Sequence, residues 1–542
     1  MRLRRLSLAL LSGGILGAGY WPGSWGVFAW AAYVPLLWVV RDSTPRQAFL
    51  WGMAFSGAEF AAATPWLYDV VRRWLELPAP ARAFCFAALC AYHGLMAGLA
   101  CAAGRRLAQL WHDRRGTDLT AAAAAFMVPA LVAAEGFFPR QFPAQLAETQ
   151  LFHLPSVQLL EAAGPAGLAW LIIGFNAALY LCFRSYKASS DQFRRYAALL
   201  ACVVVVLAAN EAWGRWRMSR VDSETALRIA QGRSLRVGMV QGRLPHDRDY
   251  LRLSHERDLH AHNLSAYDRL SREALASGPL DLLIWPGNIL PDVFDYGSAD
   301  SFDPSLGGKP LGSFLRERIS GRVPTMFYTV GRDRDGARRW AVVLTSPSQE
   351  PLALAEKMIL TPFGDYTPGG SLFPFLRRLN PNTRAMSRGT RPGVLRLPDK
   401  ARIAVLICYE DLVPGYAAGF LPLGAEVFAD IAGNSWDDTT MLPYQHMRFA
   451  ALRAVENRRY LLRSTISGVS AVIDPAGRIV QSIGAREEGV ITTTVALLDG
   501  QPLSGLVGRW LYRLAAGLLA GLCLAGLSAR RTGGPRTRPR SP

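Results

Sequence analysis

The chain has 542 residues, of which 50% are hydrophobic and 19% are charged, and its basic residues outnumber its acidic ones by 60 to 42. This composition excludes a disordered chain, a collagen-like rod and a small disulfide-rich scaffold. The net charge of +18 fits a nucleic-acid partner, an anionic membrane or a topology bias, and only the placement of the charges distinguishes these three.

Residues 1–213 are a series of apolar stretches separated by short charged breaks. Several approach the roughly 17–25 residues that cross a bilayer, so we predict seven membrane spans here and an eighth near the C-terminus. The predicted spans are residues 6–21, 24–40, 47–66, 81–103, 120–136, 163–183, 196–213 and 507–527. Trp66, Trp74 and Trp111 are expected to form interfacial belts.

The placement of positive charge predicts the topology of these spans. With a cytoplasmic N-terminus, the inner segments hold 18 Lys and Arg residues, and the outer loops between spans hold only Arg72, Arg73, Arg82 and Arg140. Residues 222–505 then lie on the outer face, and the basic tail 530–542 is expected to be disordered in the cytoplasm. Since residues 222–505 carry 33 basic and 31 acidic groups, the basic excess is a topology signal and no nucleic-acid partner is expected.

Residues 222–505 alternate short apolar runs with turn residues and amphipathic stretches. Runs of this kind predict strands at residues 235–240, 282–285, 325–330, 403–407 and 427–431, and apolar residues at helical spacing predict a helix over residues 443–459. The pattern therefore predicts an outward-facing α/β domain with its own core.

Cys408 is the only cysteine between residues 222 and 505, because the other six lie in predicted spans. It ends an apolar run and precedes Tyr409 and Glu410. The carboxyl edge of a strand is where α/β folds expose reactive groups, so this position fits a nucleophile. A buried small hydrophobic residue remains the alternative.

Lys357 is one of four lysines in a chain whose other basic residues are arginines. Lysine provides a compact charge with a tunable pKa, which suits a place beside a thiolate or an oxyanion. Such a lysine is expected to raise the thiolate fraction of a nearby cysteine. A solvated surface lysine is the alternative.

A set of motifs, taken in order, carries a resemblance to a known family. The motifs are Trp285-Pro286, Lys357 with Pro362-Phe363-Gly364, Ile407-Cys408-Tyr409-Glu410, Ser435-Trp436, Pro443-Tyr444-Gln445-His446, Arg453-Ala454-Val455-Glu456, Arg463-Ser464-Thr465 and Gly468-Val469-Ser470-Ala471-Val472. With the multi-span block they resemble the apolipoprotein N-acyltransferase family, the membrane branch of the nitrilase (carbon–nitrogen hydrolase) superfamily.

The resemblance implies a polytopic helical membrane block joined to an α-β-β-α sandwich, in a monomer of the bacterial cytoplasmic membrane. It implies transfer of an acyl chain from a phospholipid, through a cysteine thioester, to the α-amino group of a lipoprotein's N-terminal diacylglyceryl-cysteine. No cofactor or metal is implied. Mapped onto this chain, Cys408 is the nucleophile and Lys357 stabilises the oxyanion. Supporting and substrate-binding roles fall to Tyr409, Glu410, Asp365, Trp285 and Trp436.

The chain departs from the family's pattern at the general base. That glutamate directly follows Trp-Pro, where this sequence has Gly287, and the supporting glutamate after Pro-Phe-Gly is Asp365. Loss of a general base costs roughly 10²–10⁴-fold in rate. Asp365, Glu410 or Asp292 could take its place.

Three functions remain open from the sequence. The first is a lipoprotein N-acyltransferase, and the second is a catalytically impaired or inactive homologue that binds lipids or lipoproteins as a scaffold or regulator. The third is an amidase or nitrilase tethered to the membrane, which the seven predicted spans disfavour because a tether needs one helix. His446 lies in the predicted helix and is expected to be a polar core or surface residue.

Overall fold

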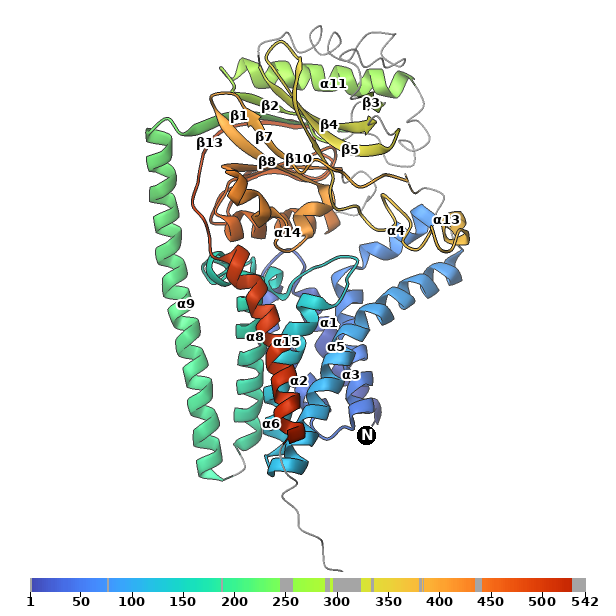
Figure 1. Cartoon of the computed structure of the whole chain (residues 1–542), viewed down its shortest axis with the longest axis vertical. Helices are drawn as coiled ribbons and strands as arrows, with labels where there is room; N and C mark the ends of the chain where they lie inside the picture. The colour runs from blue at the N-terminus through green and yellow to red at the C-terminus, as the bar shows by residue number, and fades with distance from the viewer. Residues whose placement is uncertain are drawn as a thin grey trace, which may run out of the picture.

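The computed structural model describes residues 2–75, 78–186, 189–243, 257–287, 293–295, 323–332, 336–379, 383, 385–433 and 441–528. The predicted tail 530–542, Asp292 and Trp436 lie outside these residues. A block of helices forms one end of the molecule and a sandwich of two β-sheets forms the other (Figure 1).

The helical block contains a helix over each predicted apolar stretch. Its helices are α1 (Arg2–Ala18), α2 (Ala29–Val40), α3 (Pro45–Ala63), α4 (Trp66–Leu75), α5 (Ala79–Arg115), α6 (Leu119–Phe137), α7 (Leu154–Val157), α8 (Leu160–Ser185), α9 (Ser190–Ala230) and α15 (Ser504–Ser528), with 3-10 turns η1 (Trp25–Phe28) and η2 (Leu146–Gln150). Among the described residues, α5, α6, α8, α9 and α15 are long and apolar enough to cross a membrane. The protein is therefore a membrane protein.

Helix α9 is much longer than the apolar stretch at residues 196–213. It has 41 residues and continues through a polar segment to Ala230, at the edge of the sandwich (Figure 1). Ion pairs hold this polar part, since Arg217 donates two hydrogen bonds to Glu161 and Arg478 pairs with Asp222. A prediction from hydropathy ends this span at residue 213, where the apolar stretch ends. The helix nevertheless continues to Ala230, because ion pairs stabilise its polar part.

The sandwich contains two mixed sheets. The first has the strand order β13-β1-β2-β4-β5-β6 with β3 paired to β4, and the second has the order β12-β11-β10-β9-β8-β7. The strands are β1 (Ser234–Gln241), β2 (Leu282–Ile284), β3 (Val293–Asp295), β4 (Thr325–Arg332), β5 (Arg338–Thr345), β6 (Pro351–Glu356), β7 (Val394–Leu397), β8 (Ala401–Ile407), β9 (Val427–Ala432), β10 (Leu461–Thr465), β11 (Ser470–Ile473), β12 (Ile479–Ile483) and β13 (Gly489–Ala496). The five predicted strands are thus confirmed as β1, β2, β4, β8 and β9.

Helices cover both outer faces of the two sheets. Apolar residues from both sheets, such as Val342 and Val405, form the core between them. Helix α11 (Arg257–Ala276) packs on the first sheet through Tyr267 and Leu270, and α14 (Met441–Asn457) packs on the second through Ala450. The predicted four-layer α-β-β-α sandwich is confirmed (Figure 1).

Helix α14 belongs to both ends of the molecule. Ala450 and Ala454 pack against the second sheet, whereas Leu452 and Val455 join the apolar core of the helical block. A helix that is apolar on more than one face is buried between layers. Helix α14 therefore lies between the sandwich and the helical block, and residues from both parts of the molecule line one cavity beside it.

Close packing of α1 on α3 generates a prediction about two adjacent glycines. A Cβ at Gly13 would lie 1.9 Å from the carbonyl oxygen of Phe55, whereas a Cβ at Gly14 would meet nothing within 4 Å. We expect Gly13→Ala to lower the free energy of unfolding by about 1–3 kcal/mol, since the helices must separate. Gly14→Ala, the control, should not lower it in thermal unfolding of the detergent-solubilised protein, since alanine at an open helical position is neutral or slightly stabilising. Equal effects of the two variants would contradict the described packing.

Candidate active site

Cys408 lies at a sharp turn that follows β8. Residues Ile403–Ile407 are buried in succession, as in a parallel strand covered on both faces, and the 3-10 turn η4 (Cys408–Leu412) follows directly. The backbone of Cys408 has φ = +54°, in the left-handed region that side chains other than glycine rarely adopt. Such a conformation costs about 1–3 kcal/mol and persists only where surrounding contacts hold it.

Glu410 provides the contacts that hold this turn. One carboxylate oxygen accepts hydrogen bonds from the backbone N–H groups of Met358 (2.6 Å) and Ile359 (3.0 Å), and the other accepts one from Ile407 N–H (2.9 Å). The side chain is buried, and burial raises the pKa of Glu410 against the lowering effect of these hydrogen bonds. Glu410 thereby joins the turn at Cys408 to the segment that carries Lys357.

Lys357 and Asp365 form a buried ion pair beside the turn. The Lys357 ammonium donates to Asp365 Oδ2 (2.6 Å) and to Thr361 Oγ1 (3.0 Å). Asp365 also accepts hydrogen bonds from Thr361 N–H (2.7 Å) and Trp340 Nε1–H (2.8 Å). Burial opposes both charges, but each charge stabilises the other, so the pKa of Lys357 is raised and the pKa of Asp365 is lowered. The lysine is buried, so the surface alternative is wrong.

The thiol of Cys408 does not follow the expectation that a nearby lysine increases its ionisation. Burial raises the pKa of Cys408 above its ordinary value. Lys357 acts in the expected direction, but Asp411, Asp365 and Asp430 add to the effect of burial. The cysteine is consequently held as the neutral thiol, and a reaction at sulfur needs a proton acceptor.

Gly287 lies close to the second sheet, where a side chain would make tight contacts. A Cβ at Gly287 would lie 3.0 Å from Cδ1 of Ile466 and 3.3 Å from the carbonyl oxygen of Ala432. Ile466 is buried and lines the cavity into which Cys408 opens. A side chain at position 287 would therefore require Ile466 to shift slightly.

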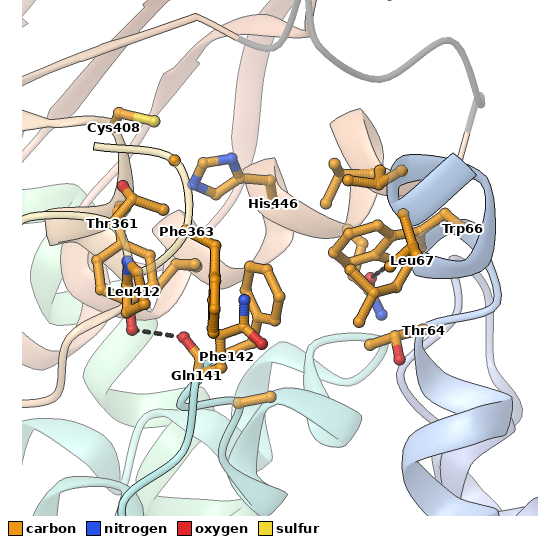
Figure 2. A pocket seen from close by; sticks show the side chains of 18 of the residues that line it. Thr64, Trp66, Leu67, Gln141, Phe142, Thr361, Phe363, Cys408, Leu412 and His446 are labelled. Atoms are coloured by element: carbon orange, nitrogen blue, oxygen red, sulfur yellow. Dashed lines mark hydrogen bonds between the residues drawn. The ribbon is translucent and has the colours of Figure 1, made fainter. Parts of the chain in front are cut away.

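A cavity of about 510 Å³ connects Cys408 to the helical block. Figure 2 shows its two sides, with Cys408, Thr361 and Leu412 facing Trp66 and Leu67 across it. Most of its lining is apolar: Val70, Val71, Phe84, Ala88 and Leu89 come from α4 and α5, and Phe142 comes from the loop after α6. An apolar cavity between membrane helices and a cysteine suits a lipid chain.

Two side chains fix the sandwich to the helical block at this cavity. The Tyr409 hydroxyl donates to the carbonyl oxygen of Gln141 (2.5 Å). Gln445, from α14, accepts a hydrogen bond from Trp66 Nε1–H (2.9 Å) and donates one to the carbonyl oxygen of Ala63 (3.0 Å). Trp66 is buried in this contact, so its predicted place in an interfacial belt is wrong.

His446 lines the same cavity and contacts a buried cluster of charged residues. Its Nε2 atom is 2.8 Å from Asp411 Oδ1, and Arg463 pairs with both Asp411 (2.8 Å) and Asp430. Burial and the Arg463 charge lower the pKa of His446, which is therefore neutral at physiological pH. The histidine is a core residue, as predicted, but one that also lines the candidate active site.

The predicted site residues fall into two groups in space. Cys408, Lys357, Asp365 and Tyr409 line one cavity, and Glu410 lies directly behind it. Trp285 lies elsewhere, because its ring packs in the core between α11 and the first sheet and donates to Ser271 Oγ (3.0 Å). Among the described residues, no cluster of His, Cys, Asp and Glu could hold a metal ion.

Comparisons with known proteins agree with this architecture. The apolipoprotein N-acyltransferase N-terminal domain matches residues 12–178, and the carbon–nitrogen hydrolase domain matches residues 323–503. A protein from Geobacter metallireducens named apolipoprotein N-acyltransferase is 26% identical, over 96% of this chain and 93% of its own. One of the same name from Gloeobacter violaceus is 28% identical, over 97% of this chain and 95% of its own. The chain belongs to the apolipoprotein N-acyltransferase family.

Family membership confirms the resemblance that the motifs predicted. Among solved structures, an amidase from Nesterenkonia sp. AN1 is similar at 22% identity and a TM-score of 0.35, covering 50% of this chain and 92% of its own. Four residues that line the cavity were not assigned to the site from the sequence: Trp66, Gln445, His446 and Ile466. Gln445 and His446 belong to one of the motifs shared with the family, which could have indicated a place in the site, whereas no motif includes Ile466.

The buried ion pair gives a prediction for stability and its pH dependence. Asp365→Asn leaves the Lys357 charge buried without a carboxylate and is expected to lower the free energy of unfolding by about 3–5 kcal/mol. Asp365 has a lowered pKa, so its contribution is present above about pH 4 and is lost as the pH falls through its folded value. Lys357 has a raised pKa, so its contribution is present below about pH 10 and is lost as the pH rises through its folded value.

Thermal unfolding from pH 4 to pH 10 checks this prediction. The deficit of Asp365→Asn should be constant across that range, and the exposed-turn variant Asp399→Asn serves as the control. A deficit that disappears near neutral pH would show that the pair does not stabilise the site.

Proposed function

We propose that this protein transfers an acyl chain from a phospholipid, through a thioester on Cys408, to the α-amino group of the N-terminal diacylglyceryl-cysteine of a lipoprotein. The observation that carries this proposal is the single cavity in which a cysteine and an ammonium group meet apolar side chains of α4 and α5. A small soluble amide gains little from contact with these apolar side chains, whereas the acyl chain of a lipid can be buried against them. This argues against a membrane-tethered amidase.

The residues around Cys408 can divide the reaction between them. The thiolate attacks the ester carbonyl, and the thioester lets one site serve two lipid substrates in turn. Lys357 places a fixed positive charge beside the sulfur, where a tetrahedral oxyanion forms. Asp365 keeps this lysine charged and oriented, and Glu410 and Tyr409 keep the turn in place.

The charge bias of the spans supports the orientation. We propose that residues 1–213 and 507–527 cross the bacterial cytoplasmic membrane, that residues 222–505 act on its outer, periplasmic face, and that the tail 530–542 lies in the cytoplasm. The cavity then opens where lipids of the outer leaflet and exported lipoproteins are both accessible. One chain supplies all the side chains named for this chemistry, consistent with a monomer.

Trapping of the acyl intermediate tests the proposal. Protein incubated with a fluorescent phospholipid should gain a hydroxylamine-sensitive label on Cys408 and pass it to a diacylglyceryl-cysteine lipopeptide. Cys408→Ala should abolish both signals, because it removes the sulfur that forms the thioester. Cys202→Ala, at an exposed cysteine of α9, is the matched control and should retain both. Absence of label and product from the native protein would refute the proposal.

A second candidate function is a catalytically impaired homologue that binds lipids or lipoproteins as a scaffold or regulator. Gly287 favours it, because the family's general base would stand at this position, and a Cβ there would lie only 3.0 Å from Cδ1 of Ile466. In this case the protein keeps the cavity and the lysine but turns over slowly.

A paired substitution distinguishes the two candidates. Gly287→Glu alone requires Ile466 to shift by a few tenths of an ångström, so the informative comparison is Gly287→Glu with Ile466→Ala against Ile466→Ala alone. If the missing base limits the native chain, the double variant should transfer acyl chains roughly 10²–10⁴-fold faster. Equal rates in a natively active protein would mean that another group serves as the base.

A further inference from the structure

A second cavity, of about 320 Å³, lies where membrane helices meet the sandwich. It is lined by the C-terminal end of α6, the start of α15, the residues after η4 and Glu456 of α14. The loop after α6 separates it from the cavity of Cys408. Residues of this loop line one cavity or the other: Arg140, Pro143 and Gln145 line the second, and Gln141, Phe142 and Ala144 line the first. The second cavity is therefore a separate site.

Three arginines line this second cavity, and within the described part of the chain none of them forms an ion pair. Arg509 and Arg513 are exposed and lie one turn apart on α15, where like charges repel each other. Arg140 is fixed in the loop, because its guanidinium donates to the carbonyl oxygens of Glu135 (2.8 Å) and Ala144. An anion between the three side chains relieves the repulsion, and phosphate has a geometry that fits the guanidinium group.

Two buried glutamates line the same cavity. Glu135 is 8% exposed and accepts a hydrogen bond from Leu146 N–H with one oxygen (2.5 Å), whereas its other oxygen has no hydrogen-bond partner among the described residues. Glu456 is 3% exposed and lies 2.9 Å from Arg453. A buried carboxylate oxygen without a donor costs free energy, so its position in a cavity wall indicates a ligand that supplies one. A ligand that meets both the arginines and the carboxylates carries charges of both signs.

The surroundings of the second cavity fit a lipid. Phe137 lines the cavity and is exposed, and Trp510 and Leu514 are exposed on α15 beside the two arginines. Both α6 and α15 are apolar enough to cross a membrane, and α15 begins directly beneath the sandwich (Figure 1). The cavity therefore lies at the level of the lipid headgroups, and basic pockets between membrane helices bind such groups.

We propose that the second cavity binds the headgroup of a phospholipid that carries a primary ammonium, with the phosphate at the arginines and the ammonium at the glutamates. The first turn of α15, at Ser504 and Gly505, also lines the cavity and adds the positive end of a helix dipole, which favours the phosphate. A primary ammonium fits better than a choline group, because a carboxylate oxygen needs an N–H donor. The inference goes beyond the proposed function, since this lipid is bound and not cleaved.

Protection of the arginines from phenylglyoxal, which modifies guanidinium groups, tests the site directly. The full-length Cys408→Ala variant in detergent is used, so that no lipid is consumed as a substrate. Added phosphatidylethanolamine should slow modification of Arg509 and Arg513 at least about tenfold, as measured on their peptides by mass spectrometry. Diacylglycerol with the same chains should not protect them. Arg72, an exposed arginine of α4, is the internal control and should react at one rate throughout.

The glutamates should produce a preference among lipids. Phosphatidylmethanol has the phosphodiester but no amine, so half-maximal protection should need about tenfold more of it than of phosphatidylethanolamine. Glu135→Gln removes the charge but keeps an acceptor for Leu146 N–H, and it should abolish most of this preference. Glu273→Gln, at an exposed glutamate of α11, is the matched control and should retain the preference.

A second variant tests the phosphate end if Glu135→Gln folds poorly. Arg509→Gln should raise the lipid concentration that protects Arg513 about tenfold, whereas Arg220→Gln, at an exposed arginine of α9, should not. The proposal is overturned if diacylglycerol protects, if Arg72 is protected equally, or if the same concentration of inorganic phosphate protects as well as the lipid. An unchanged lipid preference in Glu135→Gln would overturn it too.

The acyl-transfer assay separates this inference from the proposed function. Protection of Arg509 and Arg513 in a protein that forms no transfer product would support the lipid site and refute the function. Product formation without protection would support the function and refute the lipid site.

Discussion

The buried carboxylate of Glu410 is the constraint on which the site depends. Its oxygens accept hydrogen bonds from backbone N–H groups of two chain segments, one at the end of β8 and two in the segment that follows Lys357. These bonds compensate the left-handed backbone at Cys408 and fix the distance between two chain segments about fifty residues apart. An anion with three backbone donors is satisfied where it lies, which also removes it from proton transfer.

Helix α14 makes the cavity a joint property of the sandwich and the helical block. It packs on the second sheet with one face and on the membrane helices with another, and it carries both Gln445 and His446. The glutamine binds the ends of α3 and α4, while the histidine, one position on, faces the cysteine's side of the cavity. Two adjacent residues of α14 thus contact the two parts of the cavity, the apolar part formed by the membrane helices and the part that contains Cys408.

Much of this arrangement is visible in the sequence. Continuous apolar runs identify β8 and β9, and the abrupt change to Cys408-Tyr409-Glu410 marks a turn at a strand end, because a buried strand cannot continue through those residues. The placement of Arg on one side of the apolar stretches predicts an orientation for the helical block. These features depend on local composition and period, which sequence reasoning handles well.

Other features depend on tertiary contacts. The pairing of His446 with Asp411 joins α14 to η4, and the approach of Ile466 to Gly287 joins two sheets, so no local pattern encodes either. The sequence also suggests that a lysine promotes ionisation of the thiol, and this is overturned by burial and by three aspartates brought from separate segments. An aromatic residue near the end of a span usually lies at the lipid interface, which is the basis for the prediction at Trp66. Its indole N–H instead donates a hydrogen bond to Gln445, and the ring is buried.

The length of α9 has a mechanical consequence. A continuous helix of 41 residues is about 60 Å long, roughly twice the hydrocarbon thickness of a bilayer. Its far end is attached to the sandwich by the Arg478–Asp222 and Arg228–Asp499 pairs, so it acts as a rigid rod between membrane and sheets. A bilayer that is thicker or thinner than the apolar part of α9 would tilt this helix. The ion pairs at its far end would then pass part of that tilt to the sheets that carry Cys408.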